Sequence, residues 1–375
     1  MLIYSLALLL CSSYAIAATQ QLRFTNHPIY IPKTNESLVY PRYLELADGS
    51  TLLTANIRNL TTGDAIVSVH QTKDNGSHWE QISTVTRKIF EVGYISQPIL
   101  VQLTHDIGDY KAGTILMSAA SGGIYLYAST DQARTWQGVG KVAESPDAAK
   151  RLWEPFLLEY KGQLVLYYSD ERDADHDQKL SHQVTSDLKT WGPVVTDVDY
   201  PKKTDRPGMT VMAYIPPIDQ WILVYEFGPR DPPANWPVYY RLAKSPLEFE
   251  KSVGVPLTVK GSDITPNASP YVVWTPTGGT NGTILVVTSS TSSIYTNSHG
   301  GASDQWEEHK TLAKTGYAPS LQLPKNDPNT VLLYVGDDYN SFLTYNASHI
   351  SPPLSVTAVS LLDLAKTSKR RKHGE

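Results

Sequence analysis

Two glutamates stand among aromatic and apolar neighbours, where a carboxyl group is costly unless it has a task or a partner. Glu154 lies in the segment Leu152–Phe156 (LWEPF), and Glu226 lies in Val224–Gly228 (VYEFG). Two carboxyls in one pocket could hydrolyse a glycosidic bond: one protonates the leaving oxygen, and the other attacks the anomeric carbon or activates water. A separation of about 5 Å between them implies retention of configuration, and roughly 6.5–9.5 Å implies inversion.

The ordinary alternative to a catalytic task is an ion pair, because a buried carboxylate needs a counter-charge. Three arginines of the chain are candidate partners for either glutamate: Arg42, Arg206 and Arg241.

A repeat in the chain supplies elements that could bring the two glutamates together. Short apolar runs with period-2 alternation recur between clusters of Gly, Asn, Asp and Pro, which predicts an all-β protein. One turn that ends in an aromatic residue recurs, and its clearest copy is 72–79 (TKDNGSHW). The closing aromatic residues are spaced by 57, 55, 58 and 57 positions: Trp79, Trp136, Trp191, Phe249 and Trp306.

A second marker repeats in step with the turn, namely a Pro or Gly that opens an apolar strand. Its copies are Pro41, Pro98, Pro155, Gly208, Pro270 and Pro319. Six units of about 60 residues each match the size of four-stranded propeller blades. The sequence therefore predicts a six-bladed β-propeller as one domain, residues 18–364.

The turns themselves are expected to be structural features of the rim. An Asp side chain can accept hydrogen bonds from backbone N–H groups a few residues on, and Gly supplies a positive φ. We expect each closing aromatic side chain to be buried between neighbouring blades, where it adds a large apolar area.

In a propeller the innermost strand of each blade lines the central channel, and ligands bind at one of its mouths. The residues before the strand-opening markers are Tyr40, Gln97, Glu154, Pro207, Ser269 and Ala318, of which Glu154 is the only carboxylic acid. Matching positions on the second strands are Asn56, Ala119, Ser169, Glu226, Thr288 and Val335, of which Glu226 is the only acid. The two glutamates therefore fall on adjacent blades and are predicted to face one pocket.

These motifs together resemble one family. The turn at 72–79 matches the Asp box of sialidase-like propellers, S/T-x-D-x-G-x-x-W, and the other copies are degenerate. With W-E-P-F around Glu154, Y-E-F-G around Glu226 and Gly-Tyr-Ala-Pro-Ser at 316–320, the chain resembles the fungal exo-α-1,5-L-arabinanases of glycoside hydrolase family 93. The resemblance covers essentially all of the chain after residue 17.

The resemblance implies a secreted, retaining enzyme that releases arabinobiose from the non-reducing ends of linear arabinan. It maps the two catalytic glutamates to Glu154 and Glu226, and a pocket tyrosine to Tyr317. We expect Glu154 to be the general acid/base, because Trp153 and Pro155 would keep it protonated, and Glu226 to be the nucleophile with Tyr317 as a hydrogen-bond donor. The reverse assignment stays open, since both glutamates have aromatic neighbours.

Sugar binding requires aromatic platforms and polar side chains near the mouth of the channel. The candidate substrate-binding residues are Tyr40, Arg42, Tyr94, Trp153, Asp170, Arg206 and Tyr339. Each has a plain packing or salt-bridge role as its alternative.

Two other functions remain possible from the sequence. A sialidase would use three arginines and a tyrosine nucleophile, which Arg42, Arg206, Arg241 and Tyr317 could supply, but 41–44 (PRYL) lacks the usual Arg-Ile-Pro order. A carbohydrate-binding propeller without catalysis is the second alternative, and both pocket glutamates argue against it. The sixth unit, opened at Pro319, disfavours a five-bladed arabinanase.

The remaining features bear on the setting of the protein. Residues 1–17 end in Ala-Ile-Ala and predict a signal peptide, although a basic n-region is missing. Six N-x-[ST] sequons suggest a secreted glycoprotein, and the single cysteine, Cys11, lies within the predicted signal. The net charge of −5 argues against a nucleic-acid partner, and no later apolar run would span a membrane.

We further expect a monomer that needs no cofactor and acts on a polysaccharide, arabinan. The acidic loop Asp173–Asp177 carries possible metal ligands but lacks the spacing of a calcium loop, so no metal is expected. The basic residues 365–375 are expected to form a flexible tail.

Overall fold

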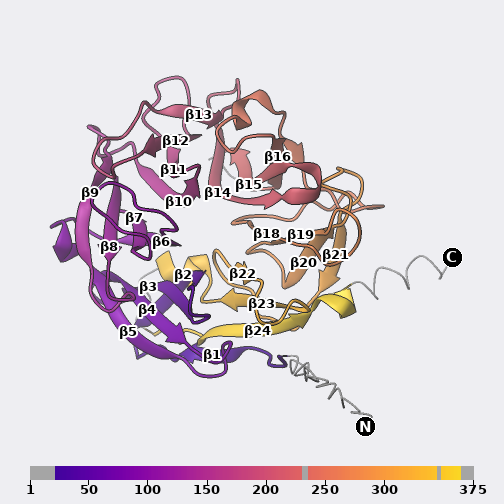
Figure 1. Ribbon diagram of the computed structural model, residues 1–375, viewed down its shortest axis with the longest axis horizontal. Coiled ribbons are helices and arrows are strands. Elements are labelled where there is room, and N and C mark those ends of the chain that lie inside the picture. Colours follow the sequence, from indigo (N-terminus) through magenta and orange to yellow (C-terminus); the bar gives the residue numbers. More distant parts are fainter. Residues whose placement is uncertain (1–21, 230–234, 344–347, 365–375) are drawn as a thin grey trace, which may run out of the picture.

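The computed structural model describes residues 22–229, 235–343 and 348–364. Within them the chain forms six antiparallel sheets of four strands each, arranged as a ring around a central axis (Figure 1). The predicted six-bladed β-propeller is therefore confirmed. The predicted signal peptide and the basic tail lie outside the described residues.

Each blade runs from its innermost to its outermost strand. Blade one contains β2 Glu36–Glu45, β3 Thr51–Asn59, β4 Ala65–Thr72 and β5 Glu80–Thr86. Blade two contains β6 Ser96–Gln102, β7 Ile115–Ala120, β8 Ile124–Ser129 and β9 Gln137–Ala143. Blade three contains β10 Leu152–Tyr160, β11 Gln163–Asp170, β12 Lys179–Thr185 and β13 Val195–Val198.

The second half of the ring continues in the same order. Blade four contains β14 Asp205–Ile215, β15 Gln220–Pro229, β16 Val238–Ala243 and β17 Val255–Pro256. Blade five contains β18 Tyr271–Thr275, β19 Thr283–Val287, β20 Ser293–Asn297 and β21 Glu307–Lys310. Blade six contains β22 Ser320–Gln322, β23 Thr330–Val335, β24 Leu354–Ser360 and β1 His27–Tyr30. Short helices connect some strands: η1 Arg87–Ile89, η2 Pro216–Ile218, η3 Phe249–Lys251 and α1 Tyr339–Leu343.

Blade six joins the two ends of the chain. Its outermost strand, β1, comes from the start of the described chain and pairs antiparallel with β24, with His27 opposite Val356. The ring is thereby closed by hydrogen bonds between segments more than 300 positions apart (Figure 1).

The hydrophobic core lies between the blades, and the closing aromatic residues of the turns are part of it. Trp79 packs edge-on against Tyr334 of blade six, with ring centroids 6.0 Å apart. Trp136 packs between blades one and two, and Trp191 between blades two and three. Phe249 and Trp306 are completely buried in the later blades. The aromatic repeat thus marks where one blade packs on the blade before it.

The turns before these aromatic residues share a hydrogen-bond pattern. In the first, the Thr72 hydroxyl donates to Asp74 and accepts from the Gly76 N–H, while Asp74 accepts from the His78 N–H. In the second, the Ser129 hydroxyl and Asp131 make the equivalent bonds. These side chains satisfy backbone donors that the tight turn would otherwise leave unpaired.

The innermost strands of blades one to four each contain a β-bulge, and the Pro or Gly marker in the sequence gives the position of this bulge only approximately. In blades one to four the ladder skips at one place, and the bulged residue has a positive φ. In blades five and six the positive-φ residue lies just before the strand. The six residues are Tyr40 (62°), Gln97 (56°), Glu154 (57°), Met209 (61°), Ser269 (50°) and Ala318 (53°).

The expected channel position of blade four, Pro207, is wrong by two residues. Prolines follow the bulged residue in blades one to three, but in blade four Thr210 holds that place, so Gly208 marks a different position there. The predicted equivalence of Ser169 and Glu226 on the second strands is confirmed, since they pair with Trp153 and Gly208 respectively, at the same place in each bulge. In blade two the matching residue is Ala120 and not Ala119.

Candidate active site

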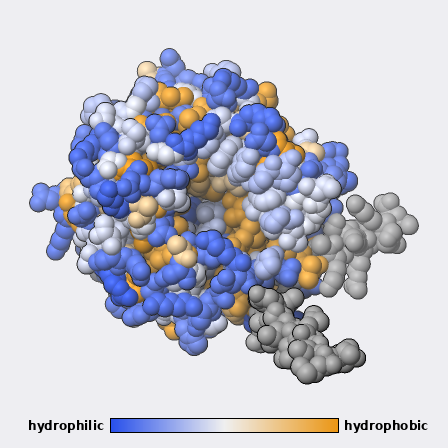
Figure 2. All heavy atoms as spheres, viewed as in Figure 1, coloured by the Kyte–Doolittle hydropathy of each residue, from blue (hydrophilic) through white to orange (hydrophobic). Residues whose placement is uncertain are grey.

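The centre of the ring is hollowed on the face drawn in Figure 2, with apolar residues visible inside the hollow and polar residues over much of the rim. Within the ring, the bulge of β10 turns Glu154 out of the strand pattern, and its side chain is only 7 % exposed. Its Oε2 accepts hydrogen bonds from the Ser169 hydroxyl, at 2.6 Å, and from the Met209 N–H, at 2.9 Å. Its own N–H donates to the Gln97 side chain at 3.0 Å.

Glu226 on the neighbouring β15 is half-buried, and its Oε2 accepts a hydrogen bond of 2.7 Å from the Ser269 N–H. Gly208 lies between the two glutamates. A Cβ atom built on Gly208 would be 3.2 Å from Glu154 Oε2 and 3.6 Å from Glu226 Oε1. The sum of these distances, 6.8 Å, is the largest possible separation of the two oxygens. The structure thus brings both carboxyls to one place.

Burial raises the pKa of both carboxyl groups, and the charge of Glu154 raises that of Glu226 further. Burial raises the pKa of Glu226 first, the charge of Glu154 adds to this, and together they outweigh the Ser269 N–H and the Arg206 charge, giving a pKa of about 8. Burial also raises the pKa of Glu154, but the Ser169 hydroxyl, the Met209 N–H and the Arg206 charge oppose it. Two carboxylates this close repel each other, so the state in which both are ionised is unfavourable. One carboxyl therefore holds a proton near neutral pH.

The hydrogen-bond donors indicate which carboxyl that is. Glu154 receives two hydrogen bonds on its carboxylate and Glu226 receives one. Donors stabilise the ionised form of a carboxyl group, so Glu154 ionises first and Glu226 keeps the proton. This favours Glu226 as the general acid and Glu154 as the nucleophile, the reverse of the roles that the aromatic neighbours suggested.

Tyr317 lies between Tyr40 and Tyr339, near enough to the two glutamates for their charges to affect it, and its role in catalysis stays a prediction. Its ring centroid is 6.0 Å from that of Tyr40 and 4.7 Å from that of Tyr339. Burial, followed by the charge of Glu154, raises the pKa of Tyr317 well above its usual range. Its hydroxyl therefore stays protonated and can act as a donor. Burial and the charges of both glutamates also raise the pKa of the half-exposed Tyr339, which places that ring near the site.

Two of the predicted binding residues are buried arginines that hold other groups. Arg42 stacks over the Tyr40 ring, 4.0 Å from its centroid, and donates to the carbonyls of Pro41 and Ala318. Arg206 forms an ion pair of 2.6 Å with Glu171 and also donates to Gln178.

The proposed ion-pair alternative for the glutamates is not what the structure shows. The ion pairs found among the described residues include neither Glu154 nor Glu226: Arg206 pairs with Glu171, while Arg42 and Arg241 donate to backbone carbonyls.

Trp153 and Gln178 form the wall next to Glu154. The Trp153 ring lies under the Arg206 guanidinium, 5.7 Å away, and its N–H donates to Gln178 Oε1 at 2.9 Å. Gln178 Nε2 would lie 2.9 Å from a Cβ atom on Gly208, so this amide borders the space between the carboxyls. The repeat markers gave no signal for Gln178, because it lies in the connection before β12.

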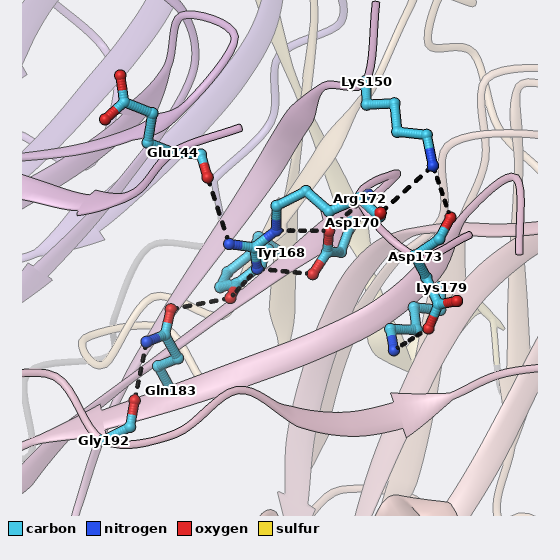
Figure 3. Close-up of polar contacts among 9 residues, drawn as sticks. All are labelled: Glu144, Lys150, Tyr168, Asp170, Arg172, Asp173, Lys179, Gln183 and Gly192. Carbon is cyan, nitrogen blue, oxygen red and sulfur yellow. Dashed lines mark hydrogen bonds and ion pairs between the residues drawn. The ribbon is translucent and has the colours of Figure 1, made fainter. Parts of the chain in front are cut away.

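Asp170 is fully engaged within its own blade. Both of its carboxylate oxygens bind the Arg172 guanidinium, at 2.9 and 2.7 Å, as Figure 3 shows. The same guanidinium reaches the Tyr168 hydroxyl at 3.1 Å. This arrangement holds the end of β11 in place. Tyr94 is half-buried and its N–H donates to the Ser121 hydroxyl. Substrate contacts of Asp170 and Tyr94 stay predictions.

The acidic loop forms internal contacts. Asp173 binds Lys179 at 2.6 Å and lies 3.4 Å from His176. Among residues 22–229, 235–343 and 348–364, no group of three or more His, Cys, Asp or Glu side chains is arranged to hold a metal ion. Over the same part of the chain, no helix is long and apolar enough to cross a membrane.

Known structures place this arrangement in a family. The α-L-arabinofuranosidase of Fusarium graminearum, solved with an iminosugar inhibitor, is 36 % identical, with a TM-score of 0.83, over 91 % of this chain and 99 % of that one. A second structure of that glycoside hydrolase family 93 enzyme contains arabinobiose and matches with a TM-score of 0.81. The chain belongs to glycoside hydrolase family 93.

The structure of a second member of family 93 is similar to that of this chain to the same degree. The α-L-arabinanase of Penicillium chrysogenum, complexed with arabinobiose, is 34 % identical over 91 % of this chain and 99 % of that one, with a TM-score of 0.82. The protein is thus a glycosidase. No family model matches the chain, and no curated protein matches it in sequence.

Sialidases share only the fold of this family 93 glycosidase. The NanB sialidase of Streptococcus pneumoniae is 10 % identical with a TM-score of 0.62, and a leech trans-sialidase is 12 % identical with a TM-score of 0.63. Identities this low carry no argument for sialidase activity.

Proposed function

We propose that the protein is a secreted, exo-acting and retaining arabinanase that releases arabinobiose from the non-reducing ends of α-1,5-linked L-arabinan. Two family 93 relatives hold arabinobiose in their solved structures, which supports the substrate class and the disaccharide product. The predicted signal peptide and the six sequons support secretion and glycosylation.

The observation that carries the proposal is the pair of carboxyls around Gly208. Their two nearest oxygens are at most 6.8 Å apart, the sum of 3.2 and 3.6 Å. This range includes the separation of about 5–5.5 Å used by retaining glycosidases and only the lower edge of the range used by inverting ones.

In the proposed reaction, Glu154 attacks the anomeric carbon while Glu226 donates its proton to the leaving glycosidic oxygen. A covalent arabinobiosyl–Glu154 ester forms as the glycosidic C–O bond breaks, and the shortened arabinan chain departs with the proton from Glu226. Glu226, now ionised, then removes a proton from water, which attacks the anomeric carbon and releases Glu154. Tyr317 stays protonated near the pair, so its hydroxyl is available as a hydrogen-bond donor during the reaction.

Product analysis on linear α-1,5-arabinan tests the proposal. We expect arabinobiose as the sole early product, and NMR of the first turnover should show the same anomeric configuration as the substrate. A mixture of oligosaccharides would overturn the exo mode, and an inverted first product would overturn retention. Absence of hydrolysis, together with retained binding in Glu226→Gln, would instead indicate a carbohydrate-binding propeller.

A further inference from the structure

Six hydrogen bonds around the channel link each blade to the blade before it, and each begins at one of the six positive-φ residues. Each positive-φ residue donates its backbone N–H to the preceding blade. The donor–acceptor distances are 3.3 Å for Tyr40 to the Tyr317 carbonyl, 2.6 Å for Gln97 to Asn56, 3.0 Å for Glu154 to Gln97, 2.9 Å for Met209 to Glu154, 2.7 Å for Ser269 to Glu226 and 3.1 Å for Ala318 to the Ser289 hydroxyl.

Both glutamates of the site take part in these hydrogen bonds, and so does Gln97, which accepts the Glu154 N–H. The Gln97 N–H donates to Asn56, which is 1 % exposed and itself donates to the Ile95 carbonyl. The Gln97 side chain then accepts the Glu154 N–H. A continuous path of hydrogen bonds therefore runs from Asn56 through Gln97 and Glu154 to the Met209 N–H.

The backbone of Glu154 needs this support because its conformation is unfavourable. A residue with a side chain at φ +57° adopts a left-handed region that L-residues rarely occupy. The bond to Gln97 fixes the peptide plane from which the side chain departs. The direction of that plane decides whether the carboxylate meets both Ser169 and Met209.

We propose that Gln97 is a positioning residue of the glycosidase reaction, which acts through the Glu154 backbone to aim the nucleophilic carboxylate. The inference rests on the proposed function for the identity of the nucleophile. Gln97 makes no contact with the reacting atoms in this role.

The test replaces Gln97 by Met, which keeps the side-chain length and removes the amide oxygen. Ser129→Ala is the control, since it removes a side-chain acceptor from a backbone N–H, that of Ala133, in a rim turn away from the glutamates. With an arabinan oligosaccharide we expect Q97M to lower kcat by about 10–100-fold and to change KM little, because small misplacements of a reacting group are costly. A displaced Glu154 carboxylate would lose its hydrogen bonds from Ser169 and Met209. The pKa that sets the acid limb of the pH profile should therefore rise. S129A should lower Tm with kcat close to that of the wild type.

Gln97→Glu keeps an acceptor for the Glu154 N–H. In the pH-independent range, kcat of Q97E should be much closer to the wild-type value than kcat of Q97M. The added negative charge should raise the pKa that sets the acid limb of its pH profile. A Q97M enzyme with the kcat and pH profile of S129A would overturn the inference. If Q97M does not fold, equal plateau kcat values of Gln97→Glu, which keeps an acceptor, and Gln97→Ala, which has none, overturn it. A wild-type enzyme that hydrolyses no arabinan would overturn the proposed function instead, so the two failures are distinct.

Discussion

At the scale of single residues, the site works because its two carboxyls are close but differ in their hydrogen bonds. Glu154 has two donors and Glu226 has one, although both are enclosed by protein. The pair therefore shares one proton near neutral pH, and the proton resides on Glu226.

Removing either carboxyl should abolish turnover, but the replacement decides the effect on stability. Glu226→Gln should lower kcat by at least about a hundredfold, as expected for loss of an acid/base group. Because an amide oxygen can still accept the Ser269 N–H, its Tm at pH 5 should stay near that of the wild type. Glu226→Ala leaves this N–H unsatisfied and should cost about 1–3 kcal/mol more in the free energy of unfolding. Kinetics and thermal melts check both parts.

The pH dependence follows from the raised pKa of Glu226. Protonated Glu226 is needed to donate to the leaving group, so kcat/KM should fall as the pH rises through about 8. Glu154 must be ionised, and this sets the acid limb. The basic limb should disappear from the pH profile of Glu226→Gln. A basic limb that remains in the variant would contradict the assignment.

The stability of the fold should also depend on pH through the ionisation of Glu226. The pKa of Glu226 is about 8 in the folded protein and about 4.5 when unperturbed, so the folded state binds the extra proton between these values. Its contribution is fully present below pH 4.5 and is lost as the pH rises toward 8. The Tm of Glu226→Gln relative to wild type should therefore increase between pH 5 and pH 8, as measured by differential scanning calorimetry.

Gly208 marks the free space between the carboxyls. Gly208→Ala would place a Cβ atom 2.9 Å from Gln178 and 3.2 Å from Glu154, so these side chains must move. We expect a loss of about tenfold to a hundredfold in kcat with a folded protein. Gly140→Ala is the control, because a Cβ atom there meets nothing within 4 Å. Equal activities of the two variants would contradict this geometry.

At the scale of elements, the bulge and the turn have separate tasks. Each innermost strand has one positive-φ residue, at a bulge in blades one to four and just before the strand in blades five and six, and only in blade three is that residue a carboxylic acid. The left-handed backbone at Glu154 is thus a feature of the blade and not of catalysis. The turns instead fix the rim of each blade.

The turn at Asp131 offers a test of this separation. Burial opposes its ionisation, but hydrogen bonds from Thr135, Ser129 and Arg134 outweigh it and lower its pKa to about 2. Asp131→Ala should destabilise the fold by about 1 kcal/mol at neutral pH without changing kcat. The difference in the free energy of unfolding between wild type and variant should decrease only as the pH falls below about 4, toward the lowered pKa of Asp131. Parallel denaturation curves and kinetics on arabinan measure both effects.

At the scale of the whole molecule, the site depends on closure of the ring. Blades three and four supply the glutamates, while blade six supplies Tyr317 and is completed by β1. Removing β1 would expose the edge of β24 and open the contact between blades six and one. A chain without residues 22–30 should melt at a markedly lower temperature and aggregate, as seen by calorimetry and size-exclusion chromatography.

Much of this protein is determined by local sequence patterns. The repeat of turn and strand signals predicted six blades, because each blade is a local unit whose turn residues fix its own backbone. The same repeat aligned Ser169 with Glu226 and placed both glutamates at the channel. In blade four the marker shifted by two residues, since Met209 occupies the bulge with no proline after it.

Only the tertiary structure decided which carboxyl holds the proton. Aromatic neighbours in the sequence made Glu154 the expected acid, but the Met209 N–H comes from the next blade and the Ser169 hydroxyl from the adjacent strand. Gln178, which borders the same space, lies in a connection that carries no repeat signal. Protonation depends on donors and charges gathered from different blades, and their directions are set by the packing of the ring, which no local pattern contains.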